Sequence, residues 1–273
     1  MSSDLPAFAP PADHDLAAEL AAAAGRLLIE LRAAAHEPDQ DERPNESPAD
    51  DAAAADAVRD AADAASHHLL LGALAAARPG DAVLSEEGER HDPGRLAARR
   101  VWIVDPLDGT KEFGERGRTD WAVHVALALD GVAAAGAVAL PALGVVVATA
   151  SPPPPPPPRP AAHPRILVSR SRPPGFAAAL AARLGAELHR LGSAGAKAMA
   201  VVRGEADAYV HDGGMHEWDV CAPAVVAAAA GLHVSRLDGS PLRFNAADPY
   251  LPDLLICRPE RSQAVLDALA GLR

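Results

Sequence analysis

The sequence is poor in aromatic residues, cysteine and lysine. Aromatic residues make up 3% of the 273 residues while 49% are hydrophobic, so the core must be built largely from Ala, Val and Leu. The two cysteines, Cys221 and Cys257, match no zinc or redox spacing. No apolar run is long enough to span a bilayer and no signal-peptide pattern is present. We therefore expect a cytoplasmic protein without a membrane span.

The net charge of the chain bears on which classes of partner it could bind. A formal net charge of −12 argues against nucleic acid or an anionic membrane as a partner. An anionic substrate would need metal ions to offset the carboxylates around it. Arginine replaces lysine almost everywhere, and the two lysines, Lys111 and Lys197, both lie within the motifs described below.

The most informative stretch is VWIVDPLDGTKEF, residues 101–113. Its β-branched apolar start predicts a buried strand, which we expect Pro106 to end. A helix is then expected to begin at the DGT tripeptide. Asp105 and Asp108 would lie on the turn between strand and helix. Carboxylates there suit hard cations, and free amides at a helix start suit phosphate, although these residues alone also fit an ordinary acidic turn.

The full stretch resembles the signature of the inositol monophosphatase family, the lithium-sensitive, Mg²⁺-dependent phosphatases of sugars and nucleotides. Lys111-Glu112-Phe113 is similar to the 3′(2′),5′-bisphosphate nucleotidase (CysQ-type) branch, whereas inositol monophosphatases usually have Thr-Asn-Phe there. The resemblance covers roughly residues 60–257. Its other pieces are VLSEE at 83–87, GSAGAK at 192–197 and WD at 218–219.

The resemblance implies an active site with two or three Mg²⁺ ions. The implied metal ligands are Glu86, Asp105, the Leu107 carbonyl, Asp108 and Asp219. The amides of Gly109 and Thr110 would receive the phosphate, and the Thr110 hydroxyl, paired with Asp63, would orient the attacking water. The implied contacts to a phosphorylated nucleotide are Ser169, Arg172, Ser193 and Lys197, and Asp219 is implied to contact the substrate as well as the metal.

The implied reaction is hydrolysis of the 3′-phosphate of 3′-phosphoadenosine 5′-phosphate to AMP, with the sulfonated parent compound as a further substrate, in sulfur metabolism. An inositol monophosphatase or fructose-1,6-bisphosphatase is the alternative enzyme, because these share every metal ligand. A catalytically silent phosphosugar-binding module is a third hypothesis, but it should have lost a ligand or the water-orienting pair. A homodimer is common among relatives, and the oligomeric state of this chain stays open.

The implied fold is the layered sugar-phosphatase fold, an α-β-α-β-α sandwich with an N-terminal α+β half and a C-terminal α/β half. We divide the chain into a metal-binding half (1–150), a polyproline loop (151–160) and a nucleotide-binding half (161–273). The pattern predicts helices at 15–35, 51–77, 174–184, 194–204, 219–230 and 260–271. It predicts strands at 82–85, 121–129, 132–140, 145–149, 165–168, 186–190, 207–210, 232–235 and 254–257.

Some assignments stay open at this level. Asp56 and Asp60 compete with Asp63, and His67 reads as a solvated or core histidine one turn later. Residues 36–51 read as a loop, and the register of 36–60 is uncertain because the family's Lys-containing segment is not evident. Pro223 is expected to place Asp219 at the mouth of its helix. The seven prolines at 152–158 predict a stiff surface loop, with a ligand for a proline-binding domain as the alternative.

Overall fold

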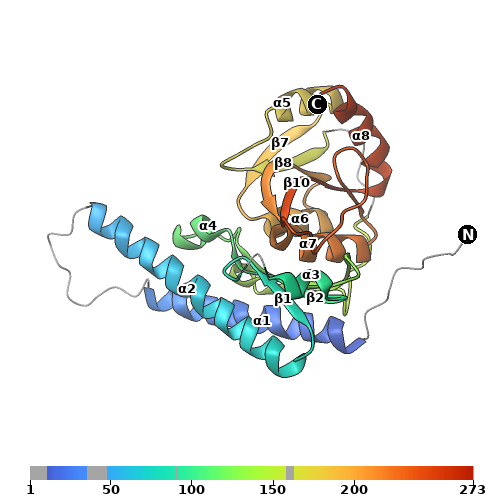
Figure 1. Cartoon of the computed structure of the whole chain (residues 1–273). Helices are drawn as coiled ribbons and strands as arrows, with labels where there is room; N and C mark the ends of the chain where they lie inside the picture. Colours follow the sequence, from blue (N-terminus) through green and yellow to red (C-terminus); the bar gives the residue numbers. More distant parts are fainter. Residues whose placement is uncertain (1–10, 36–47, 90–91, 158–162, 273) are drawn as a thin grey trace, which may run out of the picture.

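The structure is a computed structural model that describes residues 11–35, 48–89, 92–157 and 163–272. Its helices and sheets alternate in five layers, and Figure 1 shows the two sheets with helices between and outside them. The expected α-β-α-β-α sandwich is confirmed. The expected division of the chain at residues 150 and 160 stays a prediction.

The first sheet is formed before the proline run. Its five strands lie in chain order: β1 (Ala82–Ser85), β2 (Arg100–Asp108), β3 (Ala122–Leu129), β4 (Val132–Leu140) and β5 (Val145–Ala148). β1 and β2 are parallel, and the other pairs are antiparallel. Asp130 and Gly131 join β3 to β4 with φ angles of 49° and 77°, as a two-residue hairpin turn requires.

The second sheet follows the proline run. Its strands are β6 (Arg165–Ser169), β7 (Glu187–Leu191), β8 (Ala208–His216), β9 (His233–Ser235) and β10 (Tyr250–Cys257), in the order β7-β6-β8-β10-β9. β6 is parallel to β7 and β8, whereas β10 is antiparallel to both of its neighbours.

The helices form three layers around these sheets. Figure 1 shows α1 (Pro11–Ala35) and α2 (Pro48–Ala77) on the outer side of the first sheet. Between the sheets lie α6 (Ala194–Val202) and α7 (Glu217–Ala229), and the outer face of the second sheet carries α5 (Ala177–Leu184) and α8 (Ser262–Ala270). Short helices are α3 (Pro93–Ala97), α4 (Thr110–Gly114), η1 (Pro141–Leu143) and η2 (Pro259–Arg261).

Small residues let the central layer pack closely. A Cβ on Gly136 of β4 would lie 2.7 Å from Cγ1 of Val225 in α7, so helix and strand approach as closely as glycine allows. The three tryptophans, Trp102, Trp121 and Trp218, are each at most 1% exposed. They act as core residues.

Pro106 does not end its strand as expected, whereas Pro223 lies within its helix, as the predicted helix at 219–230 implied. β2 runs through Pro106 to Asp108, because a bulge between Asp105 and Asp108 removes the need for a ladder N–H at the proline. Helix α7 begins at Glu217 and continues through Pro223, which is buried between the sheets. Tertiary packing there outweighs the cost of a proline within a helix.

The observed bounds of β8 and α2 also differ from the predicted ones. β8 extends to His216 instead of ending at residue 210, because Gly213 and Gly214, with φ of 77° and 69°, form a bulge against β10. α2 begins at Pro48, so residues 48–51 are helical and not part of a loop. Residues 36–47 of that expected loop lie outside the described residues.

The described prolines, 152–157, form neither helix nor strand. Nη1 of the buried Arg258 donates to the carbonyls of Pro156 and Pro157 at 3.3 and 2.6 Å, so one end of the run is held against the second half of the chain. The role of the run stays open.

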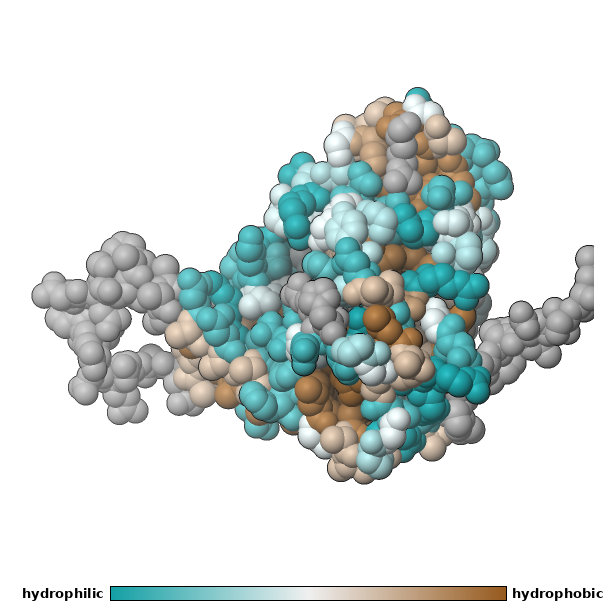
Figure 2. Space-filling model, in the orientation of Figure 1, coloured by the Kyte–Doolittle hydropathy of each residue, from teal (hydrophilic) through white to brown (hydrophobic). Residues whose placement is uncertain are grey.

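No described helix combines the length and hydrophobicity needed to cross a bilayer. On the face seen in Figure 2, hydrophobic residues lie in separate patches among hydrophilic ones.

Candidate active site

A cleft of about 560 Å³ lies between the two halves of the structure. Its walls come from the ends of β2, β6 and β8 and from the first turns of α4, α6 and α7. This volume is within the range of small-molecule sites. All the residues expected from the sequence to bind metal or substrate line this cleft, and Asp63 is not among its lining residues.

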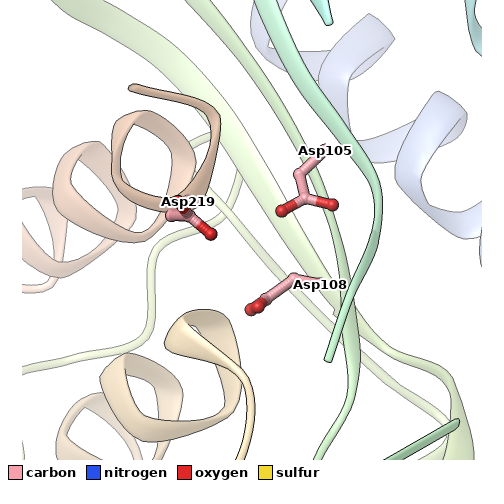
Figure 3. A group of neighbouring side chains, drawn as sticks. All are labelled: Asp105, Asp108 and Asp219. Atoms are coloured by element: carbon pink, nitrogen blue, oxygen red, sulfur yellow. The ribbon is translucent and has the colours of Figure 1, made fainter. Parts of the chain in front are cut away.

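Three aspartates meet at the base of the cleft. Asp105, Asp108 and Asp219 each offer an oxygen within 4.8 Å of the others, and Figure 3 shows them pointing toward one another. Residues three apart on a regular strand face opposite sides. The bulge at Pro106 and Leu107 therefore brings Asp105 and Asp108 to the same side of the sheet, and the start of α7 supplies Asp219.

Burial and mutual repulsion oppose ionisation of several carboxyl groups in this cluster when no cation is bound. Burial, together with neighbouring carboxylates, raises the pKa of Asp105 well above its ordinary value. For the same reasons the pKa values of Glu86 and Asp219 are each raised to about 7. Oδ2 of Asp105 is buried with no hydrogen-bond partner among the described residues. An oxygen-only set of crowded carboxylates with an unsatisfied oxygen fits a hard divalent cation.

Asp108 differs from its neighbours because its Oδ2 atom is fully engaged. It accepts hydrogen bonds from the Ser193 hydroxyl at 2.5 Å and the Gly195 amide at 2.7 Å, and Nε2 of His124 lies 3.1 Å away. Burial alone would raise the pKa of Asp108, but His124, Lys197 and Ser193 outweigh it and the pKa is lowered. Because these contacts all use Oδ2, Oδ1 is the oxygen left for a metal ion.

His124 was not identified from the sequence. Its side chain is fully buried on β3, where Nδ1 donates to the Trp218 carbonyl at 3.0 Å while Nε2 faces Asp108. One imidazole thus links Asp108 of β2 to the start of α7, next to Asp219. The signal in the sequence was a lone histidine inside the apolar strand 122–129.

Glu86 follows β1 and lines the cleft, whereas Glu87 is exposed. Helix α2 holds this region in place. His67 Nδ1 lies 2.9 Å from the Ser85 hydroxyl, and the Ser66 hydroxyl donates to the Pro106 carbonyl at 2.8 Å. His67 is therefore half-buried and in contact with the strand that carries Glu86.

The expected pairing of Asp63 with Thr110 is not formed in this conformation. The Thr110 hydroxyl donates instead to the Leu107 carbonyl at 3.1 Å, and Oδ1 of Asp63 is buried with no partner among the described residues. Burial, then Glu87 and Asp60, raises the pKa of Asp63 to about 7. Asp56 and Asp60 are exposed, so Asp63 is the buried member of the three candidates.

The turn that would receive phosphate is tightly confined. Gly109 has a φ of 88°, and a Cβ there would lie 3.1 Å from the Ser193 Cβ and 3.2 Å from the Asp120 carbonyl oxygen. Only glycine combines this backbone conformation with such close neighbours. The DGT tripeptide therefore lies directly against the loop that precedes α6.

The opposite wall carries the four expected nucleotide contacts. Ser169 ends β6, and its hydroxyl accepts from the Arg172 amide at 3.1 Å. Arg172 is exposed, with Nη2 3.4 Å from the Gly214 carbonyl. Ser193 caps α6 through the Ala196 amide. Lys197 is 3% exposed, and burial lowers its pKa to about 8.

Known proteins resemble this chain over most of its length. The model of the inositol monophosphatase family matches residues 13–152 and 163–268. A "3′-phosphoadenosine 5′-phosphate phosphatase" from Mycobacterium leprae is 48% identical over 94% of this chain and 93% of its own length. One with the same name from Mycobacterium bovis is 52% identical over 77% of this chain and 81% of its own length. The crystal structure of CysQ from Bacteroides thetaiotaomicron superimposes with a TM-score of 0.69 at 25% identity, covering 91% of this chain and 97% of that one.

Proposed function

Because the chain belongs to the inositol monophosphatase family, we propose that it is a Mg²⁺-dependent phosphatase that converts 3′-phosphoadenosine 5′-phosphate to AMP. The observation that carries this proposal is the 48% identity, over 94% of the chain, to a protein named for that activity. The sulfonated parent compound is included as a second substrate. The cytoplasmic location remains a prediction, and the oligomeric state stays open.

The acidic wall would hold the metal ions. We assign Glu86, Asp105, Asp219, Oδ1 of Asp108 and the Leu107 carbonyl to this role. When bound, divalent ions would supply charge neutralisation, an activated nucleophile and stabilisation of the leaving oxygen. The raised pKa values of Glu86 and Asp219, about 7 in each case, support the assignment because crowded carboxylates release protons readily only when a cation replaces them.

Residues around the DGT turn would position the reacting groups. Gly109 and Thr110 line the cleft, and their amides would receive the phosphate that is cleaved. For Thr110 to orient water with Asp63, its hydroxyl must exchange the Leu107 carbonyl for the unpaired Oδ1 of Asp63. The Leu107 carbonyl oxygen has two lone pairs, so it could bind a metal ion whether or not this exchange occurs.

The facing wall would bind the nucleotide. We assign Ser169 and Arg172 to direct contacts. Ser193 and Lys197 would act mainly through the loop that presses against Gly109, because the Ser193 hydroxyl holds Asp108 and the Lys197 ammonium holds the loop carbonyls. Lys197 adds a positive charge behind the loop.

Phosphate release from a substrate panel tests this function. The panel comprises 3′-phosphoadenosine 5′-phosphate, inositol 1-phosphate, fructose 1,6-bisphosphate and AMP, each with Mg²⁺, with EDTA and with added Li⁺. We expect release from the first compound only, with AMP as product, loss of activity in EDTA and inhibition by Li⁺. Preference for inositol 1-phosphate or the fructose compound would favour the alternative enzymes. Full activity in EDTA would contradict the metal-dependent mechanism.

A further inference from the structure

Three lysine and arginine side chains border the cleft: Lys111, Arg172 and Lys197. Their surroundings differ. The Lys197 ammonium donates to the carbonyls of Gly192 and Ser193 at 2.7 and 2.6 Å, and the Leu191 carbonyl lies 3.5 Å away. An ammonium has three N–H groups, so a phosphate could reach Lys197 only by displacing one of these buried contacts.

Lys111 is placed differently. It is exposed, it directly follows Thr110 at the cleft, and no hydrogen bond or ion pair joins it to any described residue. Its ammonium therefore has all three N–H groups available. Many lysines on surface turns have no polar partner. The free ammonium of Lys111 is therefore interpreted together with the contacts of its neighbours in α4.

The rest of the Lys-Glu-Phe tripeptide is fixed by contacts with the protein. The buried Glu112 forms an ion pair with Arg170 at 2.8 Å, and the same arginine forms an ion pair with Glu115. These contacts connect α4 to the end of β6 across the cleft. Phe113 packs edge-on against Trp121 with ring centroids 5.0 Å apart. Because Glu112 is ion-paired and Phe113 is packed, Lys111 is the member of the tripeptide whose polar group is available to a ligand in the cleft.

Charge balance indicates what this lysine could bind. The metal ions proposed for the acidic wall would neutralise the phosphate that is cleaved, but they cannot also serve a second phosphate elsewhere on the nucleotide. Glu112 adds a further carboxylate to the lining. A second phosphate in this cleft therefore needs a cation with free donors, and Lys111 supplies one next to the position proposed for the first phosphate.

We propose that Lys111 binds the non-reacting phosphate of a nucleoside 3′,5′-bisphosphate and thereby selects bisphosphates over monophosphates. This inference rests on the proposed phosphatase function. It makes Lys111 a specificity-determining residue, while Lys197 supports the loop.

The test compares two substrates that differ only in the second phosphate, 3′-phosphoadenosine 5′-phosphate and adenosine 3′-monophosphate. Loss of a hydrogen bond between charged groups corresponds to about a 10- to 100-fold effect. We expect Lys111→Met to lower kcat/KM for the bisphosphate by that factor, and to change kcat/KM for the monophosphate by less than about threefold. The inhibition constant of the product AMP, which keeps the 5′-phosphate, should rise by a similar factor.

Three variants serve as controls. Arg116→Met removes an exposed positive charge from the same segment but outside the cleft lining, and should leave the ratio of the two kcat/KM values unchanged. Lys111→Arg should keep most of the preference. Lys197→Met should lower kcat/KM for both substrates alike, because it disturbs the loop against Gly109. Thermal unfolding of each variant detects changes in the fold.

The outcomes separate this inference from the proposed function. If wild-type protein prefers the bisphosphate and Lys111→Met keeps that preference, the role of Lys111 is refuted while the function stands. A wild-type protein that hydrolyses both substrates equally also refutes it. If wild-type protein hydrolyses neither substrate with Mg²⁺, the proposed function fails, and the inference fails with it. Equal effects of Lys111→Met and Arg116→Met would assign the change to general charge and refute a specific role for Lys111.

Discussion

The two walls of the cleft differ in how the chain builds them. On the wall of the first sheet, Glu86, Asp105 and Asp108 come from the ends of two neighbouring strands within a short span of sequence. On the facing wall, Ser169 comes from the end of β6, Arg172 and Ser193 come from loops, and Lys197 comes from α6. The positions of these elements depend on the whole second half. The first wall carries charges suited to metal ions and chemistry, and the second carries groups suited to recognition. Variants on the two walls should therefore fail in different ways.

Asp105→Asn should have the largest effect, because it removes the most buried charge of the acidic wall without removing the side chain. We expect kcat to fall by at least about 100- to 1000-fold, the range for loss of one preorganised electrostatic contact. The fold should stay intact, since the raised pKa of Asp105 shows that its charge opposes folding when no cation is bound. Steady-state kinetics and circular dichroism measure the two results. Substantial remaining activity would remove Asp105 from the mechanism.

Asp63 and Thr110 should act as one unit on the same wall. Removing either general acid–base partner costs about 100-fold or more. The double variant Asp63→Asn/Thr110→Ala should then lose little more activity than the worse single variant. A double-mutant cycle in kcat measures this. Losses that multiply would show that the two residues act separately and that the proposed rotation of Thr110 does not occur.

The difference between the two walls also explains which parts of the site could be predicted from the sequence. The family resemblance placed Glu86, Asp105 and Asp108 in one predicted metal site. Local features of the acidic wall agree with it: strand ends, the DGT turn and an acidic pair after β1. The bulge that lets β2 pass Pro106 was missed, since its pairing with β3 is a tertiary property. His124 was missed for the same reason, because only the packing of α7 against β3 gives it two polar partners.

The facing wall was less predictable in detail. Its four residues, which we expected to contact a nucleotide, line the cleft, and their contact with a nucleotide stays a prediction. The sequence could not show that the Lys197 ammonium is occupied by loop carbonyls. That contact depends on how α6 meets the end of β7. Likewise, the Lys-Glu-Phe tripeptide was readable as a family feature, while the ion pair of Glu112 with Arg170 appears only when the two halves pack together.

Lys197→Met should weaken the facing wall while leaving the proposed metal ligands in place. It therefore tests whether the two walls act separately. Its buried carbonyl partners would lose their donors, which costs about 1–3 kcal/mol of unfolding free energy. We expect a lower Tm and a moderate loss of kcat/KM, with Mg²⁺ affinity close to that of wild type. Calorimetric titration with Mg²⁺ measures the last quantity. A loss of Mg²⁺ binding as large as in Asp105→Asn would mean that the two walls are not separable.

The pH dependence of stability should give the smallest effect. Glu86 and Asp219 have pKa values of about 7, above those of an unfolded chain, so the folded state holds their protons more tightly. Their contribution to stability is present below about pH 4, the ordinary range of unfolded carboxyls, and is lost as the pH rises through 7. In EDTA, the wild-type Tm should fall over this range more than that of Glu86→Gln. Added Mg²⁺ should raise the Tm more at pH 8 than at pH 6. Equal stabilisation at both pH values would contradict proton–metal competition.

The most direct test of the metal-binding wall is anomalous X-ray scattering from crystals soaked in Mn²⁺, which has ligand preferences close to those of Mg²⁺. The account predicts at least one anomalous peak in contact with Asp105, Asp108 and Asp219, and its disappearance in Asp105→Asn crystals. Saturating Mn²⁺ with no peak between these three carboxylates, or a peak that Asp105→Asn leaves unchanged, would contradict it.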